Sequence, residues 1–473
     1  MPHESKKRSK RAPHTLKDMG SLELPDDFIL SEEFLAAFQA LEYSSKCMYI
    51  TGEAGTGKTT LLKYFRKNSK KNIAVVAPTG IAAINSHGQT IHSFFNFPHK
   101  LIQKDQIRPV RNKQKKLFAA LQMLIIDEAS MMRADLMDGI DYALRLNKEK
   151  MNIPFGGVQV VLFGDLYQLP PIIDRELVSY YKSLYPTPYF FSAKIFSQVP
   201  FEVITLNTIY RQQDPVFINL LNKMRSKSLD ASDLEALNSN VNPPGSGFSE
   251  NFITLTPTNA AAHAINSIRL SNLSDEEFIY EAIIEGAFDQ SSYPTETQLR
   301  LKIGAQVLMI KNDPEKRWVN GSIGEVVALH AASIQVRIKD EVYQVSRSIW
   351  QKIKYKYDRE SEKLTEDVSG SFEQYPVKLA WAITIHKSQG LTFDKCIVDL
   401  GSGAFSHGQV YVALSRCRSR EGLILKRPIS SRDIIFDERV MEFPGKLNSD
   451  LSTTYEPEPI DTELEFLFDN EID

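Results

Sequence analysis

The chain has 473 residues, of which 42% are hydrophobic and 24% charged, and its formal net charge is −3 at pH 7. A chain of this length is too long to fold around one compact core, so two to four domains are predicted. No apolar stretch is long enough to span a bilayer, which argues against a membrane protein or a membrane partner. Three cysteines without metal-ligand spacing predict a reducing compartment and no structural zinc. We expect the cytoplasm, on the nucleoid if the source is bacterial, or the nucleus if it is eukaryotic or viral.

The two ends of the chain carry opposite charge. Residues 1–17 hold six Lys and Arg against one acid, so 1–27 is predicted to be a disordered basic arm that tethers DNA or carries a nuclear address. Residues 455–473 hold eight acids and no base, so 441–473 is predicted to be a disordered acidic tail. The tail would dock a basic protein partner, occupy a DNA groove, or serve only as a solubilising segment.

The first predicted element of chemical interest is a phosphate loop. The apolar run Cys47 to Thr51 predicts a strand, and Leu61 to Phe65 predicts a helix. Between them lies a complete Walker A motif, whose predicted nucleotide-binding residues are Gly52, Glu53, Ala54, Gly55, Thr56, Gly57, Lys58, Thr59 and Thr60. The backbone amides would cradle phosphates, Lys58 would reach the β- and γ-phosphates, and Thr59 would hold Mg²⁺.

Further strands follow at helical spacing. Short apolar runs at Ile73 to Ala77, Met123 to Ile126, Gln159 to Phe163 and Glu202 to Leu206 predict a parallel α/β sheet. Between the first two, residues 98–116 hold seven bases against Asp105 alone. This segment would follow a phosphate backbone or form an ordinary solvated loop.

Two strand ends carry polar side chains suited to hydrolysis. Asp127 and Glu128 follow the run ending at Ile126, where Asp127 would orient Mg²⁺ and Glu128 would act as the general base for the attacking water. Gln168 follows the next strand and is the predicted γ-phosphate sensor. Arg211 and Arg416, both in the predicted second lobe, are predicted arginine fingers, which places ATP between two lobes.

A second set of strands predicts a second α/β lobe. Its runs are Phe252 to Leu255, Leu379 to Ile385, Lys395 to Asp399 and Gly422 to Leu425. Residues 299–372 interrupt it with alternating apolar positions and a Lys339-Asp340 turn, which predict a small antiparallel β module.

The ordered set of motifs resembles superfamily-one helicases of the petite-integration-frequency (Pif) family, close to the RecD-like group. The resemblance covers Phe28 to Arg427 and rests on the motifs above together with Ala77 to Asn85, Gly88 to Phe94, Gly164 to Pro171, Tyr210 to Gln212, His386 to Thr392 and Ala413 to Arg416. Residues 135–145 and Pro154 to Gly157 favour the Pif branch. Residues 135–145 would contact DNA or form an ordinary packed helix, because Leu136, Ile140 and Leu144 recur at helical spacing.

The resemblance implies an α/β fold of two RecA-like P-loop lobes, with a small wedge in lobe one and a src-homology-type β-barrel inserted in lobe two. The implied domains are lobe one at 28–207, with a basic wedge at about 97–116, lobe two at 208–298 and 373–440, and the barrel at 299–372. Gln389 and Gly390 join the nucleotide-binding residues. The family often has an adenine-contacting glutamine where this chain has Phe34.

The resemblance also implies partners and a reaction: ATP- and Mg²⁺-dependent movement 5′→3′ on single-stranded DNA, with unwinding of forked duplexes and of G-quadruplexes, in replication, recombination, repair and telomere maintenance. The implied DNA-binding residues are Thr79, His92, Pro170, Thr258, Asn259, His386 and Lys387. Thr258 and Asn259 equally suit helix capping. Phe94, Phe95 and Phe97 suit base stacking or core packing. We expect a monomer that dimerises on DNA.

Two alternatives remain open from the sequence. An ATP-switched DNA clamp or remodelling factor would use the same nucleotide site without processive unwinding. An RNA helicase would use the same groove, because nothing in the sequence identifies a group that senses the sugar 2′-hydroxyl.

Overall fold

The computed structural model describes residues 24, 28–173, 175–212, 214–241, 252–441 and 443. The predicted arm at 1–27 and tail at 441–473 lie outside this range, apart from residues 24, 441 and 443. Within the described residues, no helix combines the length and apolar character needed to cross a bilayer.

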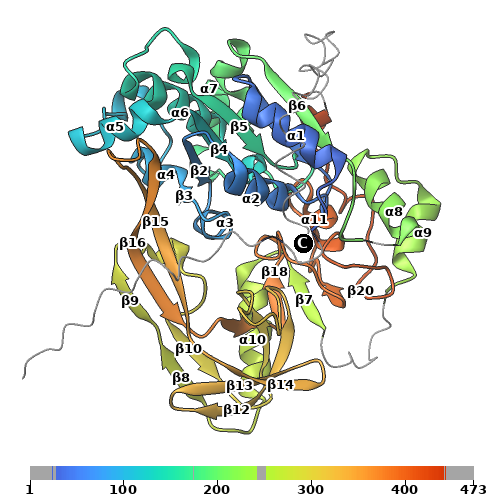
Figure 1. Ribbon diagram of the computed structural model, residues 1–473. Helices are drawn as coiled ribbons and strands as arrows, with labels where there is room; N and C mark the ends of the chain where they lie inside the picture. The colour runs from blue at the N-terminus through green and yellow to red at the C-terminus, as the bar shows by residue number, and fades with distance from the viewer. Residues whose placement is uncertain are drawn as a thin grey trace, which may run out of the picture.

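Lobe one is built on a parallel sheet with the strand order β3-β2-β4-β5-β1-β6 (Figure 1). The strands are β1 (Cys47–Gly52), β2 (Ile73–Ala77), β3 (Gln89–Thr90), β4 (Met123–Ile126), β5 (Gln159–Phe163) and β6 (Phe201–Leu206). Apart from the short β3, these match the predicted runs within one residue. Since β1 lies between β5 and β6, the phosphate loop that follows β1 meets the ends of both neighbours.

Both faces of this sheet are buried. Along each central strand, successive side chains point to opposite faces, so Tyr49 joins one apolar core and Ile50 the other. The covering helices are α1 (Glu32–Tyr43), α2 (Lys58–Asn68), α3 (Gly80–Asn85), α4 (Ile91–Phe95), α5 (Asn112–Ala120), α6 (Ala134–Asn147) and α7 (Val178–Leu184). On α6, Leu136, Ile140 and Leu144 are all buried in the core, which assigns these three side chains to packing.

The basic segment predicted as a wedge is anchored through apolar side chains. Phe97, Ile102, Ile107 and Val110 are buried in the lobe-one core. The bases between them, including Lys104, face solvent. Phe94 and Phe95 are also buried, so the three phenylalanines of this region pack in the core, and base stacking is not their role.

Lobe two has a smaller parallel sheet with the strand order β18-β7-β19-β20. Its elements are β7 (Ile253–Thr256), β18 (Ala382–Thr384), β19 (Cys396–Val398), β20 (Leu423–Leu425), α8 (Pro215–Arg225), α9 (Ala231–Asn238), α10 (Asn259–Ser271) and α11 (Gln409–Leu414). One buried cluster, which includes Phe217, Leu255 and Val412, forms its core.

An antiparallel module is inserted after α10. Its strands are β8 (Phe278–Glu281), β9 (Ile283–Gly286), β10 (Gln298–Leu301), β11 (Gln306–Met309), β12 (Ile323–His330), β13 (Ser333–Ile338), β14 (Glu341–Val345), β15 (Ser348–Tyr357), β16 (Leu364–Gln374) and β17 (Val377–Leu379). The order β14-β13-β12-β11-β17 forms its main sheet, and Lys339 and Asp340 form the predicted turn. The antiparallel strands extend beyond both ends of the predicted range 299–372.

The predicted single strand from Leu379 to Ile385 is wrong, because the chain changes partners within it. β17 pairs antiparallel with β11 in the inserted module, whereas β18 pairs parallel with β7 in lobe two. At the break, the side-chain amide of Gln306 donates to the Ala380 carbonyl at 2.7 Å. A continuous apolar run conceals this switch, since residues 379–385 include no charged side chain.

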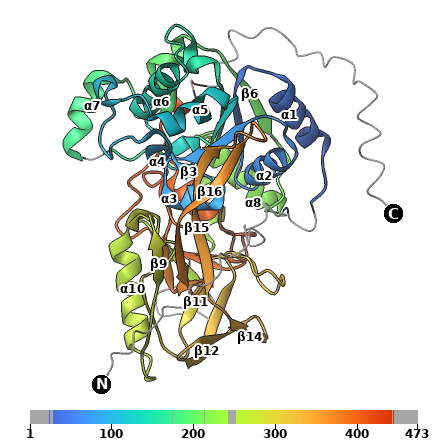
Figure 2. The same ribbon diagram turned by 60° about the vertical axis from the view of Figure 1, so that its left-hand side comes forward.

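The long hairpin β15–β16 reaches from the inserted module onto lobe one, as Figures 1 and 2 show. The Tyr355 hydroxyl accepts a hydrogen bond from the Val75 amide at 3.0 Å. Arg66 on α2 pairs with Glu366 at 2.5 Å. The hairpin therefore gives the two lobes a second connection, far along the chain from the segment that follows β6.

Candidate active site

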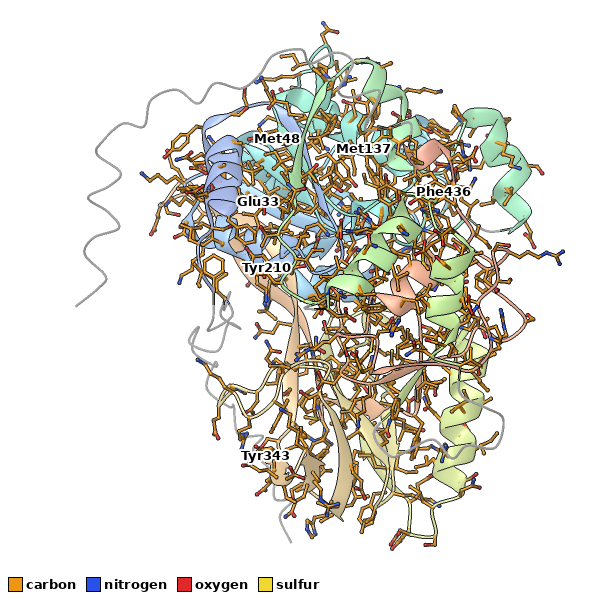
Figure 3. The ribbon with its side chains drawn as sticks, turned by 90° about the vertical axis from the view of Figure 1, so that its right-hand side faces the viewer. Glu33, Met48, Met137, Tyr210, Tyr343 and Phe436 are labelled. Carbon is orange, nitrogen blue, oxygen red and sulfur yellow. The ribbon has the colours of Figure 1, made fainter. Side chains whose placement is uncertain are left out.

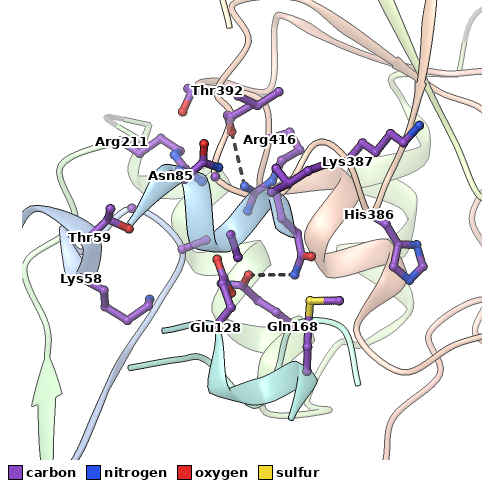
Figure 4. Close-up of a pocket in the computed structure, with 18 of the residues that line it drawn as sticks. Lys58, Thr59, Asn85, Glu128, Gln168, Arg211, His386, Lys387, Thr392 and Arg416 are labelled. Carbon is purple, nitrogen blue, oxygen red and sulfur yellow. Dashed lines mark hydrogen bonds between the residues drawn. The ribbon is translucent and has the colours of Figure 1, made fainter. Parts of the chain in front are cut away.

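A cleft of about 1430 Å³ lies between the lobes and brings together most of the predicted site residues (Figure 4). The predicted residues that line it are Ala54, Gly55, Gly57, Lys58, Thr59, Thr60, Thr79, Asp127, Glu128, Gln168, Pro170, Arg211, Thr258, Asn259, His386, Lys387, Gln389, Gly390 and Arg416. The cleft is continuous from the phosphate loop to the helix N-termini of both lobes, so nucleotide and strand-binding groups share one opening.

The phosphate loop is shaped by backbone geometry. Gly57 caps α2 in the left-handed region, with φ 79°, and a Cβ there would come within 2.8 Å of the Phe34 ring, so glycine is required. Lys58 Nζ donates to the carbonyls of Gly52 and Glu53 at 2.8 and 2.9 Å. Burial lowers the pKa of Lys58, and nearby carboxylates oppose this shift. A phosphate would replace these carbonyls as the lysine's partner.

Two acids follow β4 at the cleft, of which Asp127 is buried and Glu128 half-buried. Glu128 adopts a left-handed backbone conformation with φ 51°, which turns the chain sharply at the strand end. Burial raises the pKa of both Asp127 and Glu128, and the positive charge of Lys58 opposes the shift. Adjacent carboxylates favour a bound cation, so the site fits Mg²⁺ with Asp127 and the Thr59 hydroxyl as its protein oxygens.

Polar contacts cross the cleft near these acids. Gln389 Nε2 of lobe two lies 3.5 Å from Gln168 Oε1 of lobe one, as the dashed line in Figure 4 marks. Arg416 is 1% exposed and donates through Nε to the Val412 carbonyl at 2.9 Å. The two lobes therefore meet at the two glutamines that the sequence analysis assigned to the nucleotide site.

Arg211 carries an unsatisfied donor. Its Nη1 is buried and has no hydrogen-bond partner in the described part of the chain. The preceding residue, Tyr210, donates its amide to the Gly55 carbonyl at 2.9 Å, which holds Arg211 beside the phosphate loop. Burial lowers the pKa of Arg211. A buried guanidinium without an acceptor is a strong candidate for binding phosphate.

Some predicted residues lie elsewhere. Gly52, Glu53, Thr56 and His92 are not among the cleft-lining residues within the described ranges. The Thr56 hydroxyl is bonded to the Glu53 carbonyl, and the Glu53 side chain points away from the phosphate site toward lobe two. His92 stacks on His99 with ring centroids 4.7 Å apart. Burial and His99 lower the pKa of His92 to about 4, so its ring is neutral at pH 7.

The groove beyond the nucleotide site is built from helix N-termini. Thr79 caps α3 and Thr258 caps α10, and both also line the cleft, so capping and strand contact are compatible at these positions. His386 is half-buried and Lys387 is exposed. Burial lowers the pKa of His386, which favours the neutral form of its ring.

Several residues that line the cleft were not among the predicted site residues, and Asn85, Ile172 and Phe405 are three of them. Asn85 ends α3, while Ile172 and Phe405 are 65% and 61% exposed and come from lobe one and lobe two respectively. Large apolar side chains this exposed at a cleft suit stacking or packing against bases. The only signal in the sequence was their proximity to the motifs, because exposure depends on the tertiary fold.

Phe34 lies where the family often has its adenine-contacting glutamine. Its ring is 2% exposed, lines the cleft and lies 6.2 Å from the Tyr210 ring. Glu33, the preceding residue, accepts a hydrogen bond from the Asn207 amide at 2.7 Å and ties α1 to the segment that carries Tyr210 (Figure 3). Phe34 and Tyr210 therefore pack edge to face in this corner of the cleft.

Comparison with known proteins identifies relatives of this site. Residues 30–232 match the family model of PIF1-like helicases. The chain is 33% identical over 432 residues to the ATP-dependent DNA helicase Pif1 of Bdellovibrio bacteriovorus, covering 88% of this chain and 91% of that protein. It spans 63% and 65% of the length of the Emericella nidulans and human PIF1 helicases.

Solved structures agree with these matches. Bacteroides sp. Pif1 in complex with ADP-AlF4 has a TM-score of 0.83 and 37% identity, covering 90% of this chain and 98% of that one. Bacteroides Pif1 bound to single-stranded DNA has 38% identity, the same coverage and a TM-score of 0.66. Taken with the cleft between two α/β lobes, these relatives show that the chain belongs to the family of PIF1-like helicases.

Proposed function

We propose that the chain hydrolyses ATP in the interlobe cleft and uses the cycle to move 5′→3′ along single-stranded DNA, opening duplex forks and G-quadruplexes. The single observation that carries this proposal is the continuity of the cleft, in which phosphate-binding and strand-binding residues of both lobes face one opening. The proposed 5′→3′ direction of movement rests on the family resemblance. The proposed DNA partner is supported by the single-stranded DNA complex of the Bacteroides relative.

The proposed chemistry assigns one task to each residue. Lys58 and the α2 amides bind the phosphates, Glu128 accepts a proton from the attacking water, and Arg211 and Arg416 stabilise charge on the transferred group. Thr59 and Asp127 would hold Mg²⁺, which when bound supplies charge neutralisation at the phosphates. Gln168 and Gln389 sense the γ-phosphate from opposite lobes.

The proposed DNA path runs across both lobes. Thr79 and Pro170 would contact it from lobe one, and Thr258, Asn259, His386 and Lys387 from lobe two. Asn85, Ile172 and Phe405 join this set as residues found from the structure. His92 lies outside it.

We further propose the finer architecture. The lobes are RecA-like, the exposed bases of 97–116 form the wedge, and the antiparallel module around the main sheet β14-β13-β12-β11-β17 is a src-homology-type barrel. The protein would be a monomer that dimerises on DNA and acts in genome maintenance, on the nucleoid or in the nucleus.

A direct test compares ATP hydrolysis without nucleic acid, with single-stranded DNA and with an RNA strand of matched sequence. We expect DNA to stimulate the rate well above RNA, and Glu128→Gln to reduce kcat by about 10²–10⁴-fold while nucleotide still binds. Equal stimulation by RNA would favour an RNA helicase. Wild-type turnover in Glu128→Gln would refute the assignment of the base.

A further inference from the structure

A second arginine joins the lobes behind the phosphate loop. Arg225 is the last residue of α8, and its guanidinium lies between two carboxylates of lobe one. Nη1 lies 3.2 Å from Glu53 Oε1, and Nη2 lies 3.1 Å from Asp165 Oδ1. Arg225 is not one of the described residues that line the cleft, so it would act on the nucleotide site without contacting the nucleotide.

The guanidinium is enclosed by aromatic rings. Its central carbon lies 4.4 Å from the Tyr167 ring centroid and 5.8 Å from that of Tyr411. Its side chain is 16% exposed. A desolvated guanidinium between two carboxylates and two ring faces is held by both ion pairing and cation–π attraction.

Two neighbouring residues of lobe two strengthen the same contact. With its amide nitrogen facing the carboxylate, Asn222, one turn before Arg225, donates to both oxygens of Glu53 at 2.9 and 2.6 Å. The Tyr411 hydroxyl on α11 accepts a hydrogen bond from the Ala54 amide at 3.1 Å. Lobe two thus holds two consecutive residues of the phosphate loop, Glu53 and Ala54.

The two carboxylates matter because of their position. The carbonyl of Glu53 is one of the acceptors of Lys58 Nζ, and Asp165, two residues after β5, acts electrostatically on that lysine. Burial favours the protonated form of Asp165, but the charge of Arg225 holds its pKa below the ordinary value. Left unpaired, these two acids would repel a triphosphate and compete with it for Lys58.

We propose that Arg225 is a positioning residue for the nucleotide site: it neutralises Glu53 and Asp165 from lobe two and thereby makes phosphate binding by lobe one depend on docking of the lobes. This rests on the proposed function, since it concerns nucleotide binding in the same cleft. Arg225 differs from Arg211 and Arg416, which face the cleft itself.

The test measures the dissociation constant of a fluorescent ATP analogue for the full chain. Arg225→Met keeps the length and apolar contacts of the side chain but removes its charge, and we expect the dissociation constant to rise about tenfold. Arg225→Lys keeps the charge but loses the planar fork that reaches both carboxylates, so its dissociation constant should fall between those of wild type and Arg225→Met. Lys223→Met is the matched control, because Lys223 lies on the same helix but pairs with Asp233 inside lobe two.

A double-mutant cycle separates charge compensation from a packing role. Glu53→Gln combined with Arg225→Met removes one of the two unpaired acids and should recover most of the lost affinity. Unchanged affinity in Arg225→Met, an equal loss in Lys223→Met, or strictly additive losses in the double variant would overturn the proposal. If wild type itself binds no nucleotide, the proposed function fails instead. Thermal melting followed by circular dichroism checks that each variant is folded. If Arg225→Met does not fold, the dissociation constant of Arg225→Lys is used for the test instead.

Discussion

At the scale of single residues, the sequence predicted the groups whose chemistry depends on local order. The phosphate loop, Asp127, Glu128 and Gln168 each follow a strand, and strand ends gather at one edge of a parallel sheet, so their proximity could be inferred. Arg225 could not be inferred, because its partners Glu53 and Asp165 are 172 and 60 residues away and no local pattern marks the end of a helix as an ion-pair site.

The two predicted fingers provide the sharpest residue-scale prediction. Replacing Arg211 or Arg416 with alanine should lower kcat by about 10³–10⁵-fold, because the proposed function assigns both to stabilising charge on the transferred phosphate. Nucleotide affinity should change much less than kcat. Steady-state ATP hydrolysis and analogue binding measure the two effects separately.

Arg300→Ala serves as the control for these variants. Arg300 is an exposed arginine of the inserted module that pairs with Glu277, so its loss should leave hydrolysis unchanged. A variant of Arg211 or Arg416 with a wild-type rate would remove that residue from the transition state.

A buried pair in lobe two gives a pH-dependent prediction. Asp433 accepts hydrogen bonds from Arg427 at 2.6 and 3.0 Å and from Ser430, and the Arg427 contact holds the pKa of Asp433 below its ordinary value. A carboxyl with a depressed folded-state pKa stabilises the protein above its unfolded pKa, near 4, and loses this contribution as pH falls. Asp433→Asn should therefore lower the free energy of unfolding by about 1–3 kcal/mol at pH 7.

The measurement is urea unfolding of wild type and Asp433→Asn at pH 7 and at successively lower pH. The difference in unfolding free energy should shrink as the pH falls below about 4, because the carboxyl protonates there in the unfolded chain and only at lower pH in the folded protein. A difference that stays constant with pH would show that the pair contributes no linked stability.

At the scale of elements, the sequence pattern predicted the lobe-one strands other than β3 and missed β9. The lobe-one strands were found because their apolar runs are buried on both faces. β9 was missed because all of its residues are exposed, and its place beside β16 comes from backbone pairing alone. The break between β17 and β18 was hidden for the opposite reason, since both strands are apolar.

The docked β15–β16 hairpin leads to an element-scale prediction. Tyr355→Phe removes the hydroxyl that accepts from the Val75 amide, and a buried unpaired amide costs about 1–3 kcal/mol. Hydrogen exchange should therefore become faster in β2 and along the hairpin, since their contact is weakened.

Tyr357→Phe is the matched control, two residues further along the same strand. It should leave exchange in β2 unchanged. Equal exchange in Tyr355→Phe and wild type would show that the hairpin contact does not stabilise lobe one.

At the scale of the whole molecule, the central claim is that two α/β lobes share one cleft that converts nucleotide hydrolysis into movement on single-stranded DNA. The cleft depends on interlobe contacts of three kinds: the Gln168–Gln389 contact, the Arg225 bridge and the docked hairpin. Each joins residues far apart in the sequence, which is why the lobes could be predicted but their contacts could not.

The most direct measurement is strand separation on forked DNA carrying a single-stranded loading tail at either its 5′ or its 3′ end, with ATP hydrolysis recorded in the same reactions and Glu128→Gln as control. The account predicts unwinding from the 5′ tail alone, lost in Glu128→Gln. DNA-stimulated hydrolysis without strand separation from either tail would contradict it and would instead identify a nucleotide-switched clamp.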